Sequence, residues 1–302
     1  MKLLRSILPL LLLSFVAQAQ APIKDGAILA EFSVSDSTKV YFSQGNLQYQ
    51  AKKNIWRFAE HQYDTIGGDN KNISPRYKGW IDLFCWGTSG WNSGANEYQP
   101  YSTSTNDLNY FPGEDFKNDL IGSYANADWG VYNKISNGGN QARLWRTLTN
   151  DEWYYLINTR ANASSKKGVA RVNGMNGLIL LPDEWTLPDG IVFTSGVADG
   201  LGSDYYATVN SYTASEWAKL EANGAVFLPA AGQRFCAYVY AVGSRGFYWS
   251  SSAYSHVYSS DLFLSDSWVH ACYLYFDSSY VGMGDDDRKD GQPVRLVQDV
   301  KK

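Results

Sequence analysis

The sequence predicts an α+β fold in which two helices stand among short strands and long loops. Two features indicate this. Two stretches have the pattern of a helix N-terminus, a Thr followed three residues later by a Glu and then by apolar residues at helical spacing. Elsewhere, short alternating or apolar runs are separated by turn residues, with 27 glycines scattered over 302 residues. No linker-like stretch divides the chain, so we expect one domain over residues 20–302, with its ordered elements between residues 27 and 298.

The first nineteen residues have the composition of a secretory signal peptide. Lys2 and Arg5 precede a mostly apolar stretch over residues 7–16, and the small residues Ala17 and Ala19 follow at signal-peptidase spacing. We therefore expect cleavage after Ala19 and export to the periplasm, the cell surface or the extracellular space. No internal apolar run approaches the roughly 18 residues of a membrane helix, so we expect a protein that does not span a membrane.

The N-terminal part of the domain alternates like a strand over residues 27–60. Val40 and Phe42 fall on one side and Tyr41 on the other. The tripeptide 44–46, Gln-Gly-Asn, predicts a hairpin turn between two such strands. Residues 61–130 are rich in Gly, Asn, Ser, Tyr and Trp without clear periodicity, and we interpret them as long packed loops with short strands.

Both predicted helices begin with a capping box. The pairs are Thr149 with Glu152, and Thr213 with Glu216. We expect helices to start near Asn150 and Ala214, the first ending near Arg160 and the second stopping at Gly224. Capping accounts for both glutamates, so we do not expect them to form a catalytic acid pair.

A strand-like apolar run follows each predicted helix, at residues 177–181 and 225–228. Residues 293–297, with the sequence Pro-Val-Arg-Leu-Val, predict a final strand near the C-terminus. Together with the helices, these runs support a mixed fold in which strands occur at both ends of the domain.

Composition excludes several classes of function. The chain has 26 Lys and Arg against 30 Asp and Glu, a balance that does not favour nucleic-acid binding. Aromatic residues make up 15% of the chain, which argues against disorder. Three Cys and three His are too few for a disulfide scaffold or a His-rich metal centre. We expect no catalytic residue, no metal and no cofactor.

Three stretches of the sequence carry a family resemblance. They are residues 144–153, which contain the pattern R-x-L-T-x-x-E-W; residues 227–234, with the sequence FLPAAGQR; and residues 246–252, followed by residues 274–276 and 294–297. Together they resemble the Fibrobacter succinogenes major paralogous domain family, in the formylglycine-generating-enzyme-like branch of C-type lectin folds. The pattern is also similar to the variable proteins of diversity-generating retroelements in Bacteroidetes. The resemblance covers roughly residues 27–298.

The resemblance implies a C-type lectin-like fold, with two helices flanking small antiparallel sheets and with the N- and C-terminal strands paired. Oxidase members of the wider superfamily resemble copper enzymes that use two cysteines. Here Cys236 and Cys272 lie in the corresponding half but outside any matching motif. We expect each to be a small, partly buried residue, and a disulfide between them remains open.

The acidic and imidazole side chains give weak signals for a metal or catalytic site. The calcium-binding tripeptides of sugar-binding lectins do not occur, and the run Asp285-Asp286-Asp287 is followed at once by Arg288. We interpret this run as a solvated loop, because six or more converging oxygens are needed to hold calcium. The three histidines are isolated in the sequence, and we expect surface or packing roles for them. They are His61, His256 and His270.

The strongest functional signal lies in residues 235–290. Between Phe235 and Tyr280 there are 14 aromatics in 46 residues, twice the average of the chain, together with many serines. Trp249, Leu274 and Phe276 should belong to the core. The remaining mixture of Tyr, Ser and Asp is typical of adaptable binding surfaces. We expect one exposed face to contain Tyr238, Tyr240, Tyr248, Ser252, Tyr254, His256, Tyr258, His270, Tyr273, Tyr280, Asp285, Asp286, Asp287 and Arg288.

These observations favour an exported, non-enzymatic recognition protein whose ligand is an unknown protein or glycan. The resemblance to retroelement-associated proteins implies that this surface is diversified. An exported enzyme or accessory protein of the formylglycine-generating type is the alternative, and a reactive thiol pair or a metal would distinguish it. A structural protein that self-assembles through its aromatics is a third hypothesis.

Overall fold

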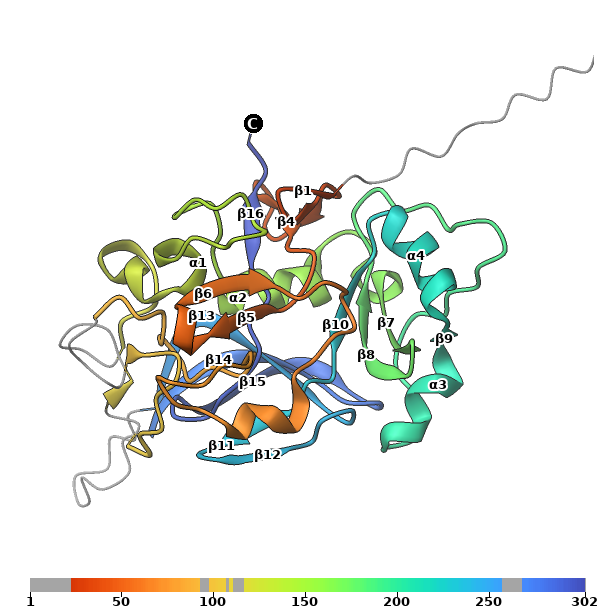
Figure 1. Cartoon of the computed structure of the whole chain (residues 1–302). Coiled ribbons are helices and arrows are strands. Elements are labelled where there is room, and N and C mark those ends of the chain that lie inside the picture. The colour runs from red at the N-terminus through yellow and green to blue at the C-terminus, as the bar shows by residue number, and fades with distance from the viewer. Residues whose placement is uncertain (1–22, 93–97, 107–108, 111–116, 257–267, 302) are drawn as a thin grey trace, which may run out of the picture.

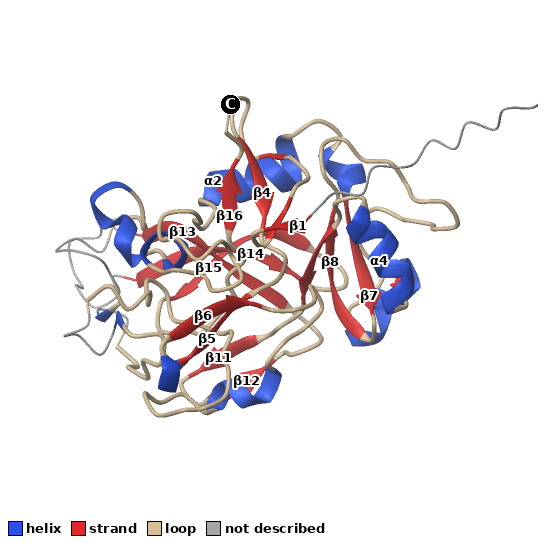
Figure 2. Ribbon diagram, turned by 45° about the horizontal axis from the view of Figure 1, so that its top comes forward, coloured by secondary structure: helices blue, strands red, loops and turns tan. Residues whose placement is uncertain are grey.

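The structure, a computed structural model, describes residues 23–92, 98–106, 109–110, 117–256 and 268–301. These residues form an α+β arrangement of six small sheets with short helices around them (Figure 1; Figure 2). The predicted mixed fold is therefore confirmed at this level. The expected signal peptide and Tyr258 lie outside the described residues. Within the described residues, no helix combines the length and apolar character that crossing a bilayer requires.

The N-terminal residues contribute to three sheets. Their strands are β1 (Ile23–Lys24), β2 (Ala27–Ile28), β3 (Phe32–Ser33), β4 (Lys39–Phe42), β5 (Leu47–Gln50) and β6 (Ile55–Phe58). β1 pairs with β2, and β5 pairs with β6. β4 lies between β3 and the C-terminal strand β16 (Val297–Asp299), with Val297 opposite Phe42 (Figure 1). The expected pairing of strands from the two ends of the domain is thus present.

Two strand predictions were wrong in detail. The tripeptide 44–46 does not close a hairpin, because β4 and β5 belong to different sheets. Gly45 instead lets the chain cross between sheets in close contact with a neighbouring backbone, since a Cβ atom there would lie 2.7 Å from the Ala59 carbonyl oxygen. At the C-terminus the strand begins at Val297 rather than Pro293. Val294 and Leu296 are buried by packing without forming a strand.

Both predicted capping boxes are present. Thr149 Oγ1 accepts from the Glu152 backbone N–H at 3.2 Å, and Thr213 Oγ1 accepts from the Glu216 N–H at 3.3 Å. Each Glu side chain reciprocates to the backbone N–H of its Thr. The helices that follow are α2 (Asn150–Tyr154), extended by a π-helical turn (Tyr155–Thr159), and α4 (Ala214–Ala222). The shorter helices are α1 (Trp129–Tyr132) and α3 (Tyr206–Val209).

The middle of the chain forms a four-stranded sheet in the order β10-β8-β7-β9. Its strands are β7 (Lys167–Val172), β8 (Met175–Leu180), β9 (Ser211–Tyr212) and β10 (Val226–Pro229). β8 and β10 coincide with the two predicted apolar runs. Helix α4 covers one face of this sheet (Figure 1). Its Trp217 and Leu220 belong to the same hydrophobic core as Ile179 and Phe227.

The C-terminal sheet has the order β13-β14-β15, with the hairpin β11–β12 beside it. The bounds are β11 (Gln233–Phe235), β12 (Tyr238–Tyr240), β13 (Gly246–His256), β14 (Trp268–Phe276) and β15 (Val281–Asp287). Tyr248, Leu274 and Phe276 pack with Trp153 of α2 in one hydrophobic core.

A second core lies beneath the long loops of residues 61–130. Trp249 is buried in it, as predicted, and donates from Nε1 to the Phe84 carbonyl oxygen at 2.7 Å. Further buried tryptophans here are Trp56, Trp86, Trp129 and Trp145. The described part of residues 61–130 contains helical turns and isolated bridges rather than named strands. The packing of these aromatic side chains therefore fixes the loops in place, a role that strand pairing has in a regular sheet.

Candidate functional site

The sheet β13-β14-β15 has an inner and an outer face, because side chains alternate along each strand. On the outer face, Phe247 stands opposite Tyr275, which stands opposite Gly282. The next row on this face is Trp249, Tyr273 and Gly284, although Trp249 itself is covered by the second core. The rings are in contact: centroids lie 5.4 Å apart for Phe247–Tyr275, 5.7 Å for Phe247–Tyr273 and 6.0 Å for Tyr275–Tyr280. We call Tyr240, Phe247, Tyr273, Tyr275 and Tyr280 the aromatic face.

Two glycines of β15 make room for this arrangement. A Cβ atom on Gly284 would lie 2.9 Å from the Tyr273 Cζ, and one on Gly282 would lie 2.2 Å from the Tyr280 hydroxyl oxygen. The rings therefore occupy the space above β15 that side chains would otherwise fill. Tyr280 keeps 52% of its surface exposed, whereas Phe247 is buried beneath its neighbours. The face thus has a packed base and an accessible rim.

The hairpin β11–β12 joins this face through a polar link. Gln233 Nε2 donates to Asp286 Oδ2 and to Asp290 Oδ2, each at 2.6 Å, and Tyr240 donates from its hydroxyl to Gln233 Oε1 at 2.8 Å. Burial raises the pKa of Tyr240 to about 12, with the Asp290 and Asp286 charges adding to the effect. Burial also raises the pKa of Asp286. The phenol therefore stays protonated and acts as a hydrogen-bond donor at neutral pH.

A second polar link lies at the turn between β14 and β15. Tyr275 donates from its hydroxyl to Asp277 Oδ2 at 2.8 Å. Burial, followed by this hydrogen bond, raises the pKa of Tyr275 to about 12. Asp277 Oδ1 also accepts from the Ser279 backbone N–H at 2.8 Å. The polar groups are therefore fixed in orientation, which suits ligand recognition better than proton transfer.

The structure brings together only some of the predicted site residues. Tyr240, Tyr273, Tyr280 and Asp286 lie at the aromatic face, and Tyr238 is 72% exposed on the adjoining hairpin. The expectation of a single exposed cluster is nevertheless wrong for several others, which lie on the inner face or in the interior.

Tyr248 is fully buried, contrary to prediction. It occupies an inner position between Phe247 and Trp249 and donates from its hydroxyl to the Pro229 carbonyl oxygen at 2.8 Å. Arg288 is also fully buried: its guanidinium lies 4.3 Å from the Trp86 ring centroid and donates to the His270 carbonyl oxygen. Both residues stabilise the interior and cannot contact an external ligand.

His270 looked isolated in the sequence, but in the structure it is buried and lies between two carboxylates. Its Nδ1 lies 2.6 Å from Asp285 Oδ1 and its Nε2 lies 3.0 Å from Asp287 Oδ1. Asp287 also pairs with Lys289. All three aspartates belong to strand β15. The interpretation of this run as a solvated loop was therefore wrong. The carboxylates at 285 and 287 flank the imidazole rather than converging on a common point.

Three remaining predicted residues lie near the far end of β13. Ser252 accepts from the Asn150 backbone N–H at 3.0 Å, so it helps to hold the start of α2. Tyr254 stands opposite His270 in the β13–β14 register. His256 ends β13, and its side chain lies outside the described features. None of these positions belongs to the outer aromatic rows.

The cysteines and acidic residues of the described chain are the side chains from which a thiol pair or a metal-binding group would be built. All three cysteines are free, so the open question of a Cys236–Cys272 disulfide is answered in the negative. Burial, with the charge of Asp285, raises the pKa of Cys272 to about 12. Among the described side chains, no group of three or more His, Cys, Asp or Glu is placed to hold a metal ion.

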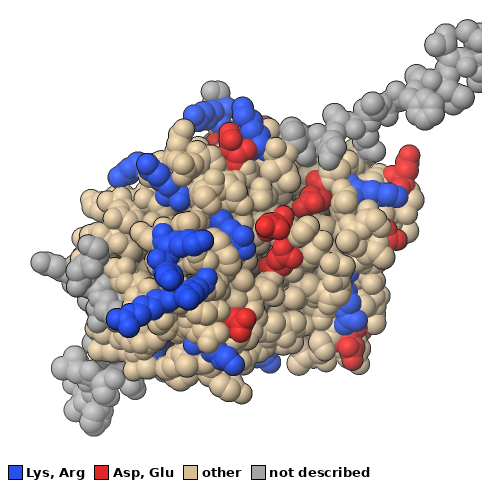
Figure 3. Space-filling model, viewed as in Figure 1, with Lys and Arg blue, Asp and Glu red and all other residues tan. Residues whose placement is uncertain are grey.

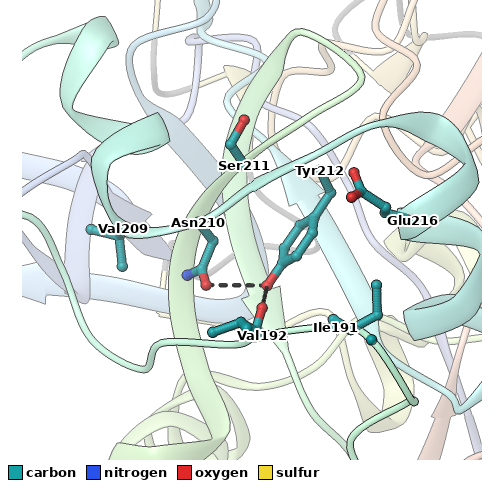
Figure 4. Close-up of a pocket in the computed structure, with 8 residues that line it drawn as sticks. Ile191, Val192, Val209, Asn210, Ser211, Tyr212 and Glu216 are labelled. Atoms are coloured by element: carbon teal, nitrogen blue, oxygen red, sulfur yellow. Dashed lines mark hydrogen bonds between the residues drawn. The ribbon is translucent and has the colours of Figure 1, made fainter.

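Two hollows of the described structure lie elsewhere. One of about 260 Å³ lies between α4 and the segment around Val192 (Figure 4). In it, the Tyr212 hydroxyl donates to the Val192 carbonyl oxygen at 2.6 Å and contacts Asn210 Oδ1 at 3.1 Å. The one carboxylate among the residues that line this hollow, Glu216, belongs to the capping box of α4. These polar groups serve the fold, so we do not assign this hollow as the functional site. A second hollow, of about 590 Å³, is lined by Ser33, Ser35, Asp36, Lys39 and neighbouring residues.

Sequence reasoning missed Phe247, Tyr275, Gln233 and Asp277. The strand period was the available signal: with Tyr273 placed outside, Tyr275 two residues later must share its face. Gln233 and Asp277 gave no signal, because their roles arise from contacts between separate elements.

Comparison of the chain with protein-family models, with curated proteins and with solved structures finds no match to any of the three.

Proposed function

We propose that this chain is an exported, non-enzymatic recognition protein that binds a protein or glycan ligand at its aromatic face. The observation that carries the proposal is the row of contacting rings ending in the half-exposed Tyr280. Tyrosine offers a large contact area at low entropic cost, and ligand anchors are enriched in it. Tyr240 and Tyr275 are already oriented by Gln233 and Asp277, so less side-chain freedom is lost on binding.

A C-type lectin-like scaffold is part of the same proposal. It is supported by the two capped helices, the small antiparallel sheets and the pairing of β4 with β16. In this proposal the signal peptide directs export, and the protein remains periplasmic or reaches the cell surface.

The competing proposal, an exported enzyme or accessory protein of the formylglycine-generating type, needs a reactive thiol pair or a metal held by thiolates. A thiolate is the reactive form of cysteine. Cys272, with a pKa raised to about 12, is protonated at neutral pH, and Cys236 lies separately in the β11–β12 turn. These features favour recognition over thiol chemistry.

The test uses a printed glycan array and a displayed peptide library as probes. Wild type is compared with the double variant Tyr275→Ala/Tyr280→Ala and with a matched control, Tyr132→Ala/Tyr154→Ala, whose rings are exposed on α1 and α2. We expect ligands of the wild type to lose roughly tenfold or more in affinity with the first variant only, because each lost anchor costs about 1–2 kcal/mol.

Equal losses in both double variants would remove the aromatic face from the proposal. Rapid labelling of Cys272 in the folded protein, together with stoichiometric copper, would instead favour the enzyme.

A further inference from the structure

The chain carries a local excess of positive charge. Residues 51–80 contain six Lys and Arg against three Asp and Glu, whereas the whole chain has 26 against 30. Lys52, Lys53, Arg76 and Lys78 are exposed and Arg57 is partly exposed. We call these five residues the basic patch.

The fold brings the basic patch together from two segments. Lys52 and Lys53 lie in the turn between β5 and β6, whose Lys52 backbone N–H donates to the Tyr77 carbonyl oxygen at 3.0 Å. Gln50 Nε2 donates to the Lys78 carbonyl oxygen at 2.7 Å. The segment 76–78 is therefore fixed alongside the turn. On the face viewed in Figure 3, several Lys and Arg side chains gather on the left, and others lie at the top and on the right, whereas most acidic side chains lie in the middle and on the right.

The charges of the basic patch are poorly neutralised. Of the carboxylates that the structure describes, none lies within ion-pair distance of Lys52, Lys53, Arg76 or Lys78. Arg57 has a weak contact with the exposed Glu60, at 3.8 Å. Its guanidinium lies 3.9 Å from the Trp80 ring centroid, which holds it flat against the surface. Unpaired surface cations of this kind attract a polyanion over about one Debye length, roughly 8–10 Å.

We propose that the basic patch binds an acidic polysaccharide. Four of the five cations lie outside strands, in the turn 51–53 and the segment 76–78, and only Arg57 lies in a strand, β6. The surface they form offers mainly charge and hydrogen bonding. None of the exposed large apolar side chains of the described chain falls within residues 51–80. A membrane-binding surface usually adds insertable apolar residues, and the centre of a protein interface is usually depleted in lysine.

The same residues disfavour a nucleic acid. Binding of single strands usually relies on exposed aromatic rings that stack on bases. Here Trp80 is already covered by Arg57, and Tyr77 is only partly exposed. A linear polysaccharide with repeated sulfate or carboxylate groups needs only spaced cations, which the basic patch supplies. The proposal uses residues outside the aromatic face and is independent of the function assigned there.

The experiment measures binding of the full chain to dextran sulfate, and unsulfated dextran serves as the neutral probe. Binding is measured at about 50 mM salt, because the Debye length is longer there than at physiological ionic strength. The variant Lys52→Gln/Lys53→Gln/Lys78→Gln is compared with Lys24→Gln/Lys219→Gln/Lys301→Gln, which removes the same charge from exposed lysines elsewhere. We expect the first variant to lose roughly tenfold or more in affinity and the second less than about twofold, since only short-range charges contribute strongly. Polygalacturonate should behave like dextran sulfate.

Three results would overturn the proposal. Equal losses in the two triple variants would indicate a general effect of net charge. Absence of binding to either polyanion in the wild type would show that the basic patch is only a solvated surface. Tighter binding to phosphatidylglycerol vesicles, or to single-stranded oligonucleotides, than to dextran sulfate would assign the basic patch to another class of partner.

Discussion

The two faces of the sheet β13-β14-β15 are built from similar residues and have opposite environments. On the inner face, Tyr248, Leu274 and Phe276 are fully buried against α2 and the other sheets. On the outer face, Tyr273 and Tyr275 are partly exposed, and β15 contributes glycines instead of apolar side chains. The same residue type, tyrosine, therefore builds the core at 248 and lines the candidate site at 273 and 275. Strand parity, and not composition, separates the two roles.

The largest expected difference between the faces is in stability. Tyr248→Ala should lower the free energy of unfolding by about 3–5 kcal/mol, because it leaves a cavity and removes the hydroxyl that pairs with Asn46 and Pro229. Tyr275→Ala should cost about 1 kcal/mol, since its ring is partly solvated. Chemical denaturation of both variants measures the difference. Comparable losses would mean that the two faces are buried alike.

A smaller effect should follow from filling the space above β15. Gly284→Ala should destabilise the protein by about 1–3 kcal/mol, the usual cost of overpacking, because its Cβ would meet the Tyr273 ring. Gly68→Ala is the matched control, since nothing lies within 4 Å of a Cβ there and its φ is not positive. If Gly284→Ala were as mild as the control, the Tyr273 ring would be free to shift away from β15 rather than fixed against it.

The smallest expected effect is a pH dependence specific to the outer face. Burial raises the pKa of Asp286 above its ordinary value of 3.8, so the folded protein holds this proton more tightly than the unfolded chain. Stability from this group is therefore present at low pH and falls as pH rises from about 4 through the folded pKa. Asp286→Asn should flatten that part of the profile of unfolding free energy against pH. An unchanged profile would contradict the burial of this carboxyl.

Local sequence signals were sufficient where a single segment determines its own structure. Thr149 and Thr213 correctly located two helix starts, because a capping box is completed within four residues. The Gln-Gly-Asn turn prediction failed because β4 pairs with β3 and with β16, the latter more than 250 residues away, and not with the adjacent β5. Nothing in the local pattern specifies such a partner.

The candidate site was predictable only in part for a related reason. The density of tyrosine indicated the correct region, but assigning its residues to one exposed face placed Tyr248 and Arg288 on the surface. Residues 246–256 and 268–276 are instead long strands, in which adjacent side chains point in opposite directions. The links through Gln233 and Asp277 depend on contacts between elements that no pattern along the chain reveals.

Strand β15 is also the last strand of its sheet in the described structure, and its sequence ends in three aspartates. Edge strands can pair with a second copy and start aggregation, and charged residues on the edge oppose this. A protein that keeps several aromatic rings near such an edge is exposed to that risk. The three aspartates of β15 place negative charge along this edge, so the strand that carries the aromatic face also carries a feature that opposes pairing with a second copy.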